Sequence, residues 1–375
     1  MAATWRWALG GMAAAALALG VGEVAAAFLG GGSPIAAVGA LVIDLQPPGA
    51  KDLMVALFGT NDKLALEVAT AIGALLVGAV MGALARRWQP VPTIGLLAFG
   101  AVAFFAISRD PLVGYAVAAA IAVLAVLAGL LALRWLLPPP ADAIAGATVA
   151  GATEGTPAPK PLVGAPLARR GFLVLSAVAL AAGGLLTLVG RMLTGRVPVI
   201  TGSTPIPAPS RTAPPLPAGA DFAIDGLAPI VVPNEDFYRI DTRLTVPRLD
   251  AATWSLRIHG MVEREVQLSY ADLLAMPLVE QYVTIACVSN EVGGYLVGNA
   301  KWTGTPLVPL LERAGVKSGA SQLVGRSFDG WTCGFPTAHL AGAGADAMVA
   351  VAMNGEPLPA AHGFPARLIV PGLYG

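Results

Sequence analysis

The sequence predicts two regions of different fold class: an all-α transmembrane region of about five helices, and then an α+β domain. Hydrophobic residues make up 56% of the 375-residue chain and charged residues only 12%. Soluble domains carry about 25% charged residues. The deficit of charge lies almost wholly in residues 1–193, whereas residues 237–375 have a composition suited to water.

Composition also limits the classes of function. The formal net charge is zero, so no nucleic-acid partner is indicated. Two cysteines, Cys287 and Cys333, do not make a disulfide framework or a zinc site. The three histidines, His259, His339 and His362, follow residue 193, so the apolar region cannot bind haem through two histidines.

The apolar region divides into membrane-length segments. A spanning helix needs about 20 apolar residues, and four stretches fit: roughly 7–29, 64–85, 112–136 and 171–190. A fifth, 91–108, is shorter but nearly unbroken. The segment 34–45 is too short to span, so it is predicted to be interfacial or re-entrant. Many residues in these helices are small, which allows close helix packing.

Basic residues predict the orientation of these helices. Cytoplasmic loops carry an excess of Lys and Arg, and the pairs Arg86-Arg87 and Arg169-Arg170 fall on the same side if five helices span. The N-terminus is then cytoplasmic. The protein is predicted to be a multi-pass protein of the cell membrane with its C-terminal domain on the extracytoplasmic side.

The last apolar segment begins with an export-like motif. Arg169-Arg170-Gly171-Phe172-Leu173 directly precedes an uncharged stretch, as in a twin-arginine (Tat) export signal. The alternative is that the pair only sets topology. Charged residues within the predicted spans are candidates for function, and Glu23 and Glu67 are the acidic residues found there. An anchor is favoured over a transporter.

The predicted domain limits follow from these patterns. Pro138-Pro139-Pro140 ends the fourth helix, and a Pro-rich tract after the fifth favours a semi-rigid extended spacer. The predicted parts are a four-helix transmembrane region with a short interfacial segment (1–137), a cytoplasmic linker (138–170), the fifth transmembrane helix (171–193), a Pro-rich linker (194–233) and the α+β domain (234–375).

The α+β domain is predicted to contain short strands and short helices. Ser269 is a predicted N-cap, and Asn354-Gly355 is a hairpin turn signal. Apolar alternation and β-branched runs predict the strands. The predicted strands are 254–260, 266–269, 281–287, 347–352 and 366–370, and the predicted helices are 270–275 and 306–314.

Cys287 is the candidate for chemistry. It ends a buried-looking strand and is followed by Ser289, Asn290, Glu291 and a Gly-Gly pair. A thiolate is a soft ligand suited to a redox metal, although a free cysteine is more often a small buried hydrophobe. Cys333 lies among packing residues and is predicted to be structural.

Four sequence blocks, in order, resemble the sulfite oxidase-like molybdopterin enzymes over roughly residues 234–375. These blocks are Thr284-Ile-Ala-Cys-Val-Ser-Asn-Glu-Val-Gly-Gly294, Asn299-Ala-Lys-Trp-Thr-Gly304, Asn354-Gly-Glu-Pro-Leu-Pro359 and His362-Gly-Phe-Pro-Ala-Arg367-Leu-Ile-Val-Pro-Gly372. Asn234-Glu-Asp-Phe-Tyr-Arg239 resembles the family's N-terminal cofactor-contacting loop.

The resemblance implies the sulfite oxidase fold and a Mo–molybdopterin cofactor. In that family one cysteine thiolate ligates molybdenum, and Cys287 occupies this place as catalytic residue and metal ligand. His362 and Arg367 match residues that bind the phosphate end of the pterin. The other implied cofactor-binding residues are Asn234, Tyr238, Arg239, Ser289 and Asn290. The implied reaction is a two-electron oxygen-atom transfer, with a separate protein or the quinone pool as electron partner.

The sequence departs from the family in two places. Sulfite oxidases carry arginines just after the metal-binding cysteine, but here Val288 to Glu291 follow. A small S- or N-oxide is therefore expected as substrate, in place of sulfite. The family normally continues beyond the position of Gly375, so the domain is expected to be incomplete at its C-terminus. The alternative is an inactive remnant, or a membrane scaffold or transport protein with an accessory domain.

Overall fold

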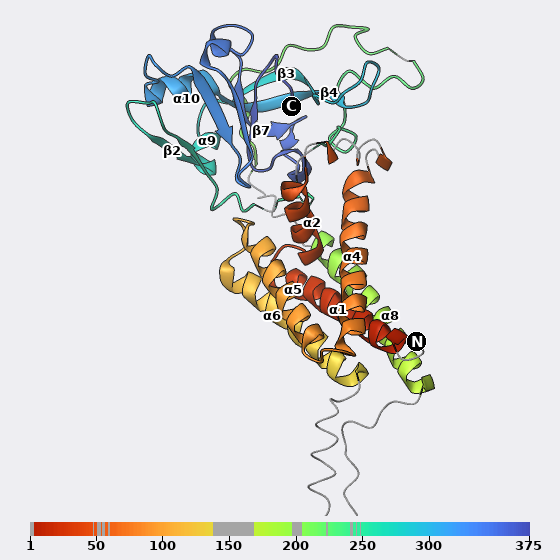
Figure 1. The fold of residues 1–375 in the computed structure, drawn as a ribbon. Coiled ribbons are helices and arrows are strands. Elements are labelled where there is room, and N and C mark those ends of the chain that lie inside the picture. Colours follow the sequence, from red (N-terminus) through yellow and green to blue (C-terminus); the bar gives the residue numbers. More distant parts are fainter. Residues whose placement is uncertain are drawn as a thin grey trace, which may run out of the picture. The chain divides into compact units, whose positions relative to one another are not determined.

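The computed structural model describes residues 4–137, 169–196 and 205–375, apart from residues 48, 51–53, 55–56, 59–60, 223, 241–242, 245 and 248. The chain forms two compact units, Met1–Val197 and Pro198–Gly375 (Figure 1). The predicted linker 138–170 lies outside the described residues except for its last two, which are helical.

The first unit is helical. Its described helices are α1 (Thr4–Leu29), α2 (Pro34–Leu45), α4 (Asp62–Ala85), α5 (Val91–Ser108), α6 (Tyr115–Leu136) and α8 (Arg169–Arg196). Five of them are long and apolar enough to cross a membrane, and α2 is shorter. These helices match the five predicted spans, and α2 matches the predicted short segment 34–45.

Helix α1 is the centre of this unit. It packs against α4, α6 and α8, and it is the most enclosed of the five long helices. Glycines permit the close crossings: a Cβ at Gly82 would lie 2.2 Å from the carbonyl oxygen of Trp7, and a Cβ at Gly20 would lie 2.5 Å from that of Gly183. Packing of this kind was expected from the many small residues.

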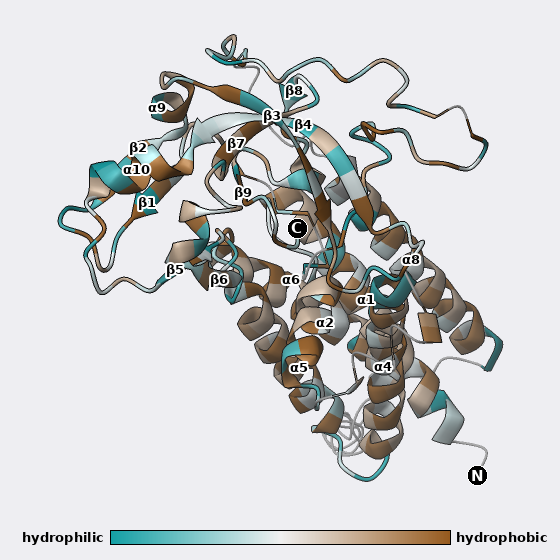
Figure 2. Ribbon diagram, turned by 90° about the horizontal axis from the view of Figure 1, so that it is seen from above, coloured by the Kyte–Doolittle hydropathy of each residue, from teal (hydrophilic) through white to brown (hydrophobic). Residues whose placement is uncertain are grey.

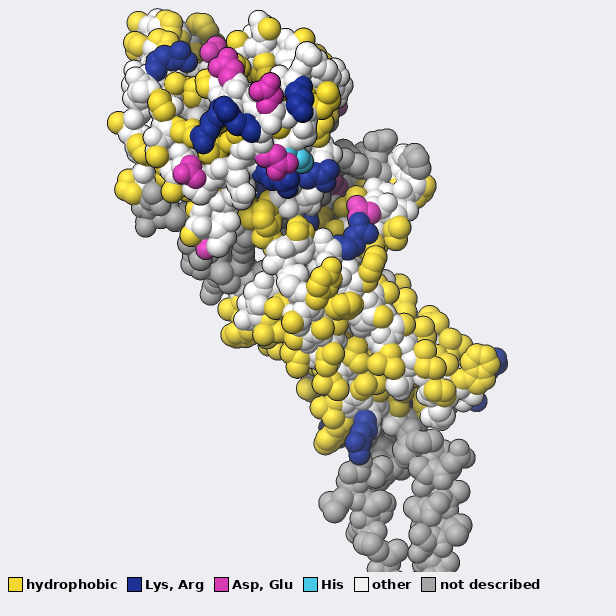
Figure 3. Space-filling view, turned by 90° about the vertical axis from the view of Figure 1, so that its left-hand side faces the viewer, with side chains coloured by type: hydrophobic (Ala, Val, Ile, Leu, Met, Phe, Trp, Pro, Cys, Tyr) yellow, Lys and Arg dark blue, Asp and Glu magenta, His cyan; other side chains and the backbone are white. Residues whose placement is uncertain are grey.

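The outward-facing side chains of this unit are mainly apolar. Leu76, Val80 and Leu127 are each more than half exposed. Figure 2 shows long hydrophobic stretches on these helices, and Figure 3 shows hydrophobic side chains over the visible face of the unit. Such a surface is suited to lipid contact, because apolar side chains outside a bilayer would remain exposed to water.

The Arg169-Arg170 pair opens α8 and lies where α8 meets α1. The guanidinium of Arg169 lies 6.0 Å from the Trp5 ring centroid, and that of Arg6 lies 4.7 Å from the Phe172 ring centroid. Trp5 and Phe172 meet edge to face at 5.9 Å. These cation–π and aromatic contacts give the motif a packing role in the helical unit.

The second unit is built on one antiparallel sheet in the order β3-β4-β7-β8, with β9 also paired to β7. Its strands are β1 (Ser255–Ile258), β2 (Val266–Ser269), β3 (Val279–Ala286), β4 (Val297–Pro306), β5 (Gln322–Arg326), β6 (Thr332–Pro336), β7 (Met348–Met353), β8 (Glu356–Pro357) and β9 (Arg367–Ile369). Its helices are α9 (Tyr270–Leu274) and α10 (Leu307–Ala314), with 3₁₀ turns at Thr337–Ala341 and Ala360–His362.

Most predicted elements of this unit are present. The Ser269 hydroxyl accepts a hydrogen bond from the Asp272 N–H, and the Asp272 side chain accepts from Ser269 in return, which makes a capping box. Asn354 and Gly355 both have positive φ, 54° and 87°, as a tight hairpin turn requires. All six residues of β7 are buried, so this strand is the centre of the core.

Four strands, β4, β5, β6 and β8, were not predicted. The sequence of β4 contains glycines, an asparagine and a lysine, so it lacks the alternation of a half-buried strand. Its pairing with β7 shifts between Thr303 and Gly304. A Cβ at Gly304 would lie 2.3 Å from the Val349 carbonyl oxygen, so only glycine fits this close approach.

Two further expectations need correction. Cys333 was expected to be structural, but it is an exposed residue of β6. The Pro-rich tract was expected to be a spacer, but its residues near 206–211 pack on the second unit. The N–H of Ser210 donates to Leu278 O and that of Glu280 to Arg211 O, each at 2.8 Å, and Ile206 contacts the core.

A glycine pair within α4 tests the packing of α1. A Cβ at Gly82 meets the α1 backbone, whereas nothing lies within 4 Å of a Cβ at Gly73. Gly82→Ala is expected to destabilise the protein by about 1–3 kcal/mol through overpacking. Gly73→Ala is expected to stabilise it by up to about 1 kcal/mol through helix propensity. Thermal unfolding in detergent measures both, and equal effects would contradict the packing.

Candidate active site

Strand β3 carries Cys287 to the edge of the second unit. The strand pairs with β4 from Val279–Gly304 to Ala286–Val297, and Cys287 follows directly. The Cys287 N–H donates to Leu296 O at 2.9 Å, which closes the connection between the two strands. The thiol is partly exposed, and its Sγ lies 3.0 Å from the Ser289 hydroxyl. A ligand can therefore reach this sulfur.

Asn290 fixes the loop that follows Cys287. Its N–H donates to Cys287 O at 3.0 Å, and its side-chain oxygen accepts from the Leu296 N–H at 2.8 Å. The side-chain oxygen is thus used to hold the loop, while the amide nitrogen can still donate. Glu291, the next residue, is exposed.

The loop of residues 234–239 is anchored by Phe237. This buried ring lies edge to face with Trp302 at 6.0 Å and with His362 at 5.5 Å, and it stacks on Tyr238 at 5.3 Å. Gly298 leaves room for it, because a Cβ there would lie 2.6 Å from the Phe237 ring. Sequence reasoning did not identify the roles of Phe237, Trp302 and Gly298.

Asn234 holds the start of the same loop. Its side-chain oxygen accepts from Asn354 Nδ2 at 2.9 Å, and its own Nδ2 donates to Met353 O at 3.2 Å. Its backbone oxygen lies 2.9 Å from His362 Nε2. Asn354, predicted only as a turn residue, therefore also joins the hairpin to the loop.

His362 is buried, at 6% exposure. Burial lowers the pKa of its imidazole, the hydrogen bond with the Asn234 carbonyl opposes this, and the positive charges of Arg367 and Arg239 lower the pKa further. A neutral ring whose Nε2 donates to Asn234 O leaves Nδ1 as an acceptor. In this geometry His362 positions the loop, and only Nδ1 is free toward a ligand.

Arg367 holds its charge in a partly buried position. Its guanidinium lies 5.6 Å from the Trp302 ring centroid and donates to His362 O at 3.3 Å. Partial burial lowers its pKa, an effect opposed by Tyr238. No carboxylate pairs with it among the described residues. A charge that is partly removed from water favours a partner of opposite sign, so this guanidinium fits the anionic phosphate end of a cofactor, which it could bind with its planar fork.

Tyr238 lies within electrostatic range of both Cys287 and Arg367. Burial raises the pKa of its phenol, the Arg367 charge opposes this, and the Cys287 side chain adds to it. The N–H of Gly375 donates to Ala286 O at 2.9 Å, and a Cβ on Gly375 would lie 2.6 Å from the Tyr238 oxygen. Gly375 thus joins the end of β3, just before Cys287, to Tyr238.

A cavity of about 440 Å³ opens beside this loop. Three of the predicted residues, Asn234, Arg239 and His362, line it. Tyr238, Cys287, Ser289, Asn290 and Arg367 are not among its lining residues. The described residues contain no group of three or more His, Cys, Asp or Glu side chains placed to hold a metal ion. A metal at Cys287 would therefore take other ligands from a cofactor.

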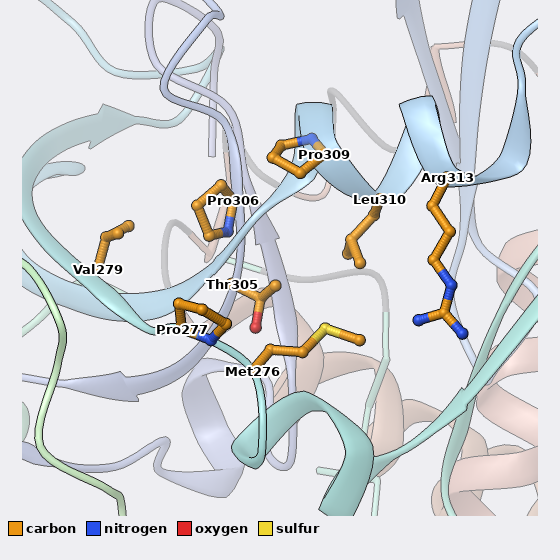
Figure 4. A pocket seen from close by; sticks show the side chains of 8 residues that line it. All are labelled: Met276, Pro277, Val279, Thr305, Pro306, Pro309, Leu310 and Arg313. Carbon is orange, nitrogen blue, oxygen red and sulfur yellow. The ribbon is translucent and has the colours of Figure 1, made fainter.

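Another cavity, of about 280 Å³, lies at the opposite end of β3. Met276, Pro277 and Leu310 are among its apolar walls, and Arg313 lies at its side (Figure 4). None of the predicted site residues lines it, and it offers no thiol or carboxylate. Its walls lack the groups that a redox metal needs, so the residues around Cys287 are the stronger candidate.

Comparison with known proteins identifies a domain over this part of the chain. Residues 243–375 match the oxidoreductase molybdopterin binding domain. The uncharacterized oxidoreductase YuiH of Bacillus subtilis is 34% identical over 125 residues, 33% of this chain and 60% of that protein. Human mitochondrial sulfite oxidase is 31% identical over 169 residues, 39% of this chain and 31% of that protein.

Solved structures also match this chain. Among them, the sulfane dehydrogenase SoxCD from Paracoccus pantotrophus has 28% sequence identity and a TM-score of 0.36, with 40% of this chain and 41% of that chain covered. The chain spans less than two thirds of the length of each of these relatives. Residues 243–375 thus match a molybdopterin-binding domain and are similar to sulfite oxidase-like molybdenum oxidoreductases, which implies Mo–molybdopterin as the cofactor.

Proposed function

We propose that this chain is a membrane-anchored oxidoreductase that transfers an oxygen atom to or from a small S- or N-oxide, with molybdenum bound by Cys287. The observation that supports it most is a partly buried guanidinium, that of Arg367, which has no carboxylate partner among the described residues and lies in the same domain as the accessible thiol of Cys287. When bound, the cofactor supplies a metal that changes oxidation state by two electrons.

The chain's own residues would position the cofactor and the substrate. The Cys287 thiolate would ligate the metal, and Arg367 would neutralise the phosphate end, with Arg239 lining the adjacent cavity. His362 and Asn234 would hold the loop 234–239 in place through their mutual hydrogen bond. The Ser289 hydroxyl, 3.0 Å from the Cys287 sulfur, could donate to that sulfur and tune it.

The helical unit would serve as the anchor. Its five long apolar helices are compatible with membrane insertion, and the Arg86-Arg87 and Arg169-Arg170 pairs favour a cytoplasmic N-terminus. The oxidoreductase domain would then lie on the extracytoplasmic side after Tat export in a folded state. Electrons would pass to or from a separate protein or the quinone pool.

The two cysteines allow a matched test of the metal ligand. Cys287→Ser is expected to lower molybdenum-dependent turnover by about 100-fold or more, because even residues that only orient a ligand cost about 10–100-fold. Cys333→Ser is expected to have no effect, since this thiol is exposed on β6. Protein made in a molybdopterin-competent host is assayed for molybdenum and activity. Molybdenum absent from the wild type would favour the inactive-remnant alternative.

Arg367 can be tested through cofactor content. Arg367→Met keeps much of the side-chain volume and removes the charge. Loss of charge-assisted hydrogen bonds worth about 1.5–3 kcal/mol should weaken pterin binding by about 10–100-fold. The cofactor-free protein should not lose stability, because no anion is left unpaired. Arg257→Met, which removes an exposed partner of Glu265, should retain the cofactor. A strongly destabilised Arg367→Met apoprotein would indicate a structural role.

Glu291 should disfavour sulfite. Its carboxylate follows Cys287 closely and is exposed, so it repels a dianion more than a neutral sulfoxide. The wild type is expected to turn over sulfite poorly, and Glu291→Gln should raise kcat/KM for sulfite by up to about 5-fold, the scale of an exposed charge interaction. Dimethyl sulfoxide turnover should not change. Steady-state rates with artificial electron carriers decide this, and efficient sulfite oxidation by the wild type would refute it.

A further inference from the structure

A small polar cluster lies inside the apolar helical unit. Glu23 of α1, Glu67 of α4 and Arg191 of α8 are each about one to two turns from an end of their helix. Arg191 forms an ion pair with Glu67. Glu67 and Arg191 are the charged side chains that act electrostatically on Glu23 among the described residues. Helix α6, which also packs on α1, brings the methyl group of Ala125 near Gly22.

Glu23 is fully enclosed, and its two oxygens differ in their surroundings. Oε1 accepts from the Ser33 hydroxyl at 2.7 Å and from the Ile35 N–H at 3.0 Å. Oε2 has no hydrogen-bond partner. Helix α8 closes over the group, because a Cβ at Gly190 would lie 2.8 Å from the Glu23 Cβ. The carboxyl group therefore has one satisfied oxygen and one bare oxygen in an apolar setting.

This asymmetry matches a carboxylic acid better than a carboxylate. A carboxylate spreads its charge over both oxygens, and a buried anionic oxygen without donors is costly. An un-ionised acid has one carbonyl oxygen with two acceptor sites and one hydroxyl oxygen. Here Oε1 would be the carbonyl oxygen and Oε2 the hydroxyl oxygen.

Two other roles for an ionised Glu23 fit less well. Capping α2 as an anion is one, but the hydrogen bond from the Ile35 N–H of that helix reaches Oε1 alone, and Oε2 would remain a buried anionic oxygen without a donor. Pairing with a cation is the other, but Arg191 is taken by Glu67. A proton on Glu23 makes the three groups neutral in sum, which suits an apolar interior.

We propose that Glu23 is a proton-binding site of the helical unit, with an exchangeable proton on Oε2 beside the Glu67–Arg191 ion pair. The site is independent of the redox function proposed above, since it uses none of the residues of the second unit. Its ligand is the proton, and the fixed ion pair supplies polar groups next to it.

Infrared spectroscopy of the full-length protein in detergent tests the proposal. At neutral pH the wild type should show the carbonyl stretch of a protonated carboxylic acid, with the small shift in D₂O that marks an exchangeable proton. Glu23→Gln should remove this band, whereas Glu67→Asp, which keeps a counter-charge for Arg191, should retain it. A band that survives Glu23→Gln, or no band at all, would overturn the assignment. Loss of the wild-type band on adding sodium chloride at constant pH would mean that a cation occupies the site instead.

Thermal unfolding of the Glu23→Gln and Glu67→Gln variants gives a second readout, which does not depend on the infrared band. Glu23→Gln replaces a neutral group by a neutral group of the same shape, so Tm should change by no more than a few degrees. Glu67→Gln leaves Arg191 without its counter-charge and should lower Tm more. If Glu23→Gln lowers Tm as much as Glu67→Gln does, Glu23 is ionised in the folded protein and the proposal fails.

Discussion

The contact of Phe237 with Trp302 and His362 is the interaction on which the candidate site depends. Three segments far apart in sequence meet there: the loop 234–239, strand β4 and the turn before β9. The contact is possible because Gly298 has no side chain where the Phe237 ring lies. The ring in turn fixes the loop from which Asn234, Tyr238 and Arg239 reach the site. Packing of the Phe237 ring therefore sets the positions of the polar side chains on this loop.

Charge in the second unit points to a ligand. Arg367 is partly buried against Trp302 without a carboxylate partner among the described residues, and the pKa of its neighbour His362 is lowered. A neutral histidine beside an arginine limits the positive charge that the interior must hold. The remaining charge suits a phosphate, which would stabilise the folded state by binding to it alone. The cofactor would therefore supply the negative charge that the protein residues around Arg367 do not provide.

Much of this architecture could be predicted from sequence, and the failures share a cause. Strands β3 and β7 are β-branched or apolar runs, and α9 has Ser269 as its cap, so local patterns suffice. Strand β4 could not be predicted, because Gly298 and Gly304 are explained only by Phe237 and the Val349 carbonyl. In the candidate site, Cys287 could be predicted because it lies in a recognisable sequence motif. Trp302 and Asn354 act through tertiary contacts, and such contacts cannot be predicted from local sequence patterns.

Each unit contains a titratable or charged group that its immediate neighbours do not fully satisfy: the partly buried Arg367 in the second unit and the fully buried Glu23 in the first. A guanidinium cannot shed its proton at ordinary pH, so Arg367 requires an anion from outside. A carboxylate can take up a proton, so Glu23 can become neutral without any partner. The difference in side-chain chemistry thus explains why one group points to a cofactor and the other to a proton.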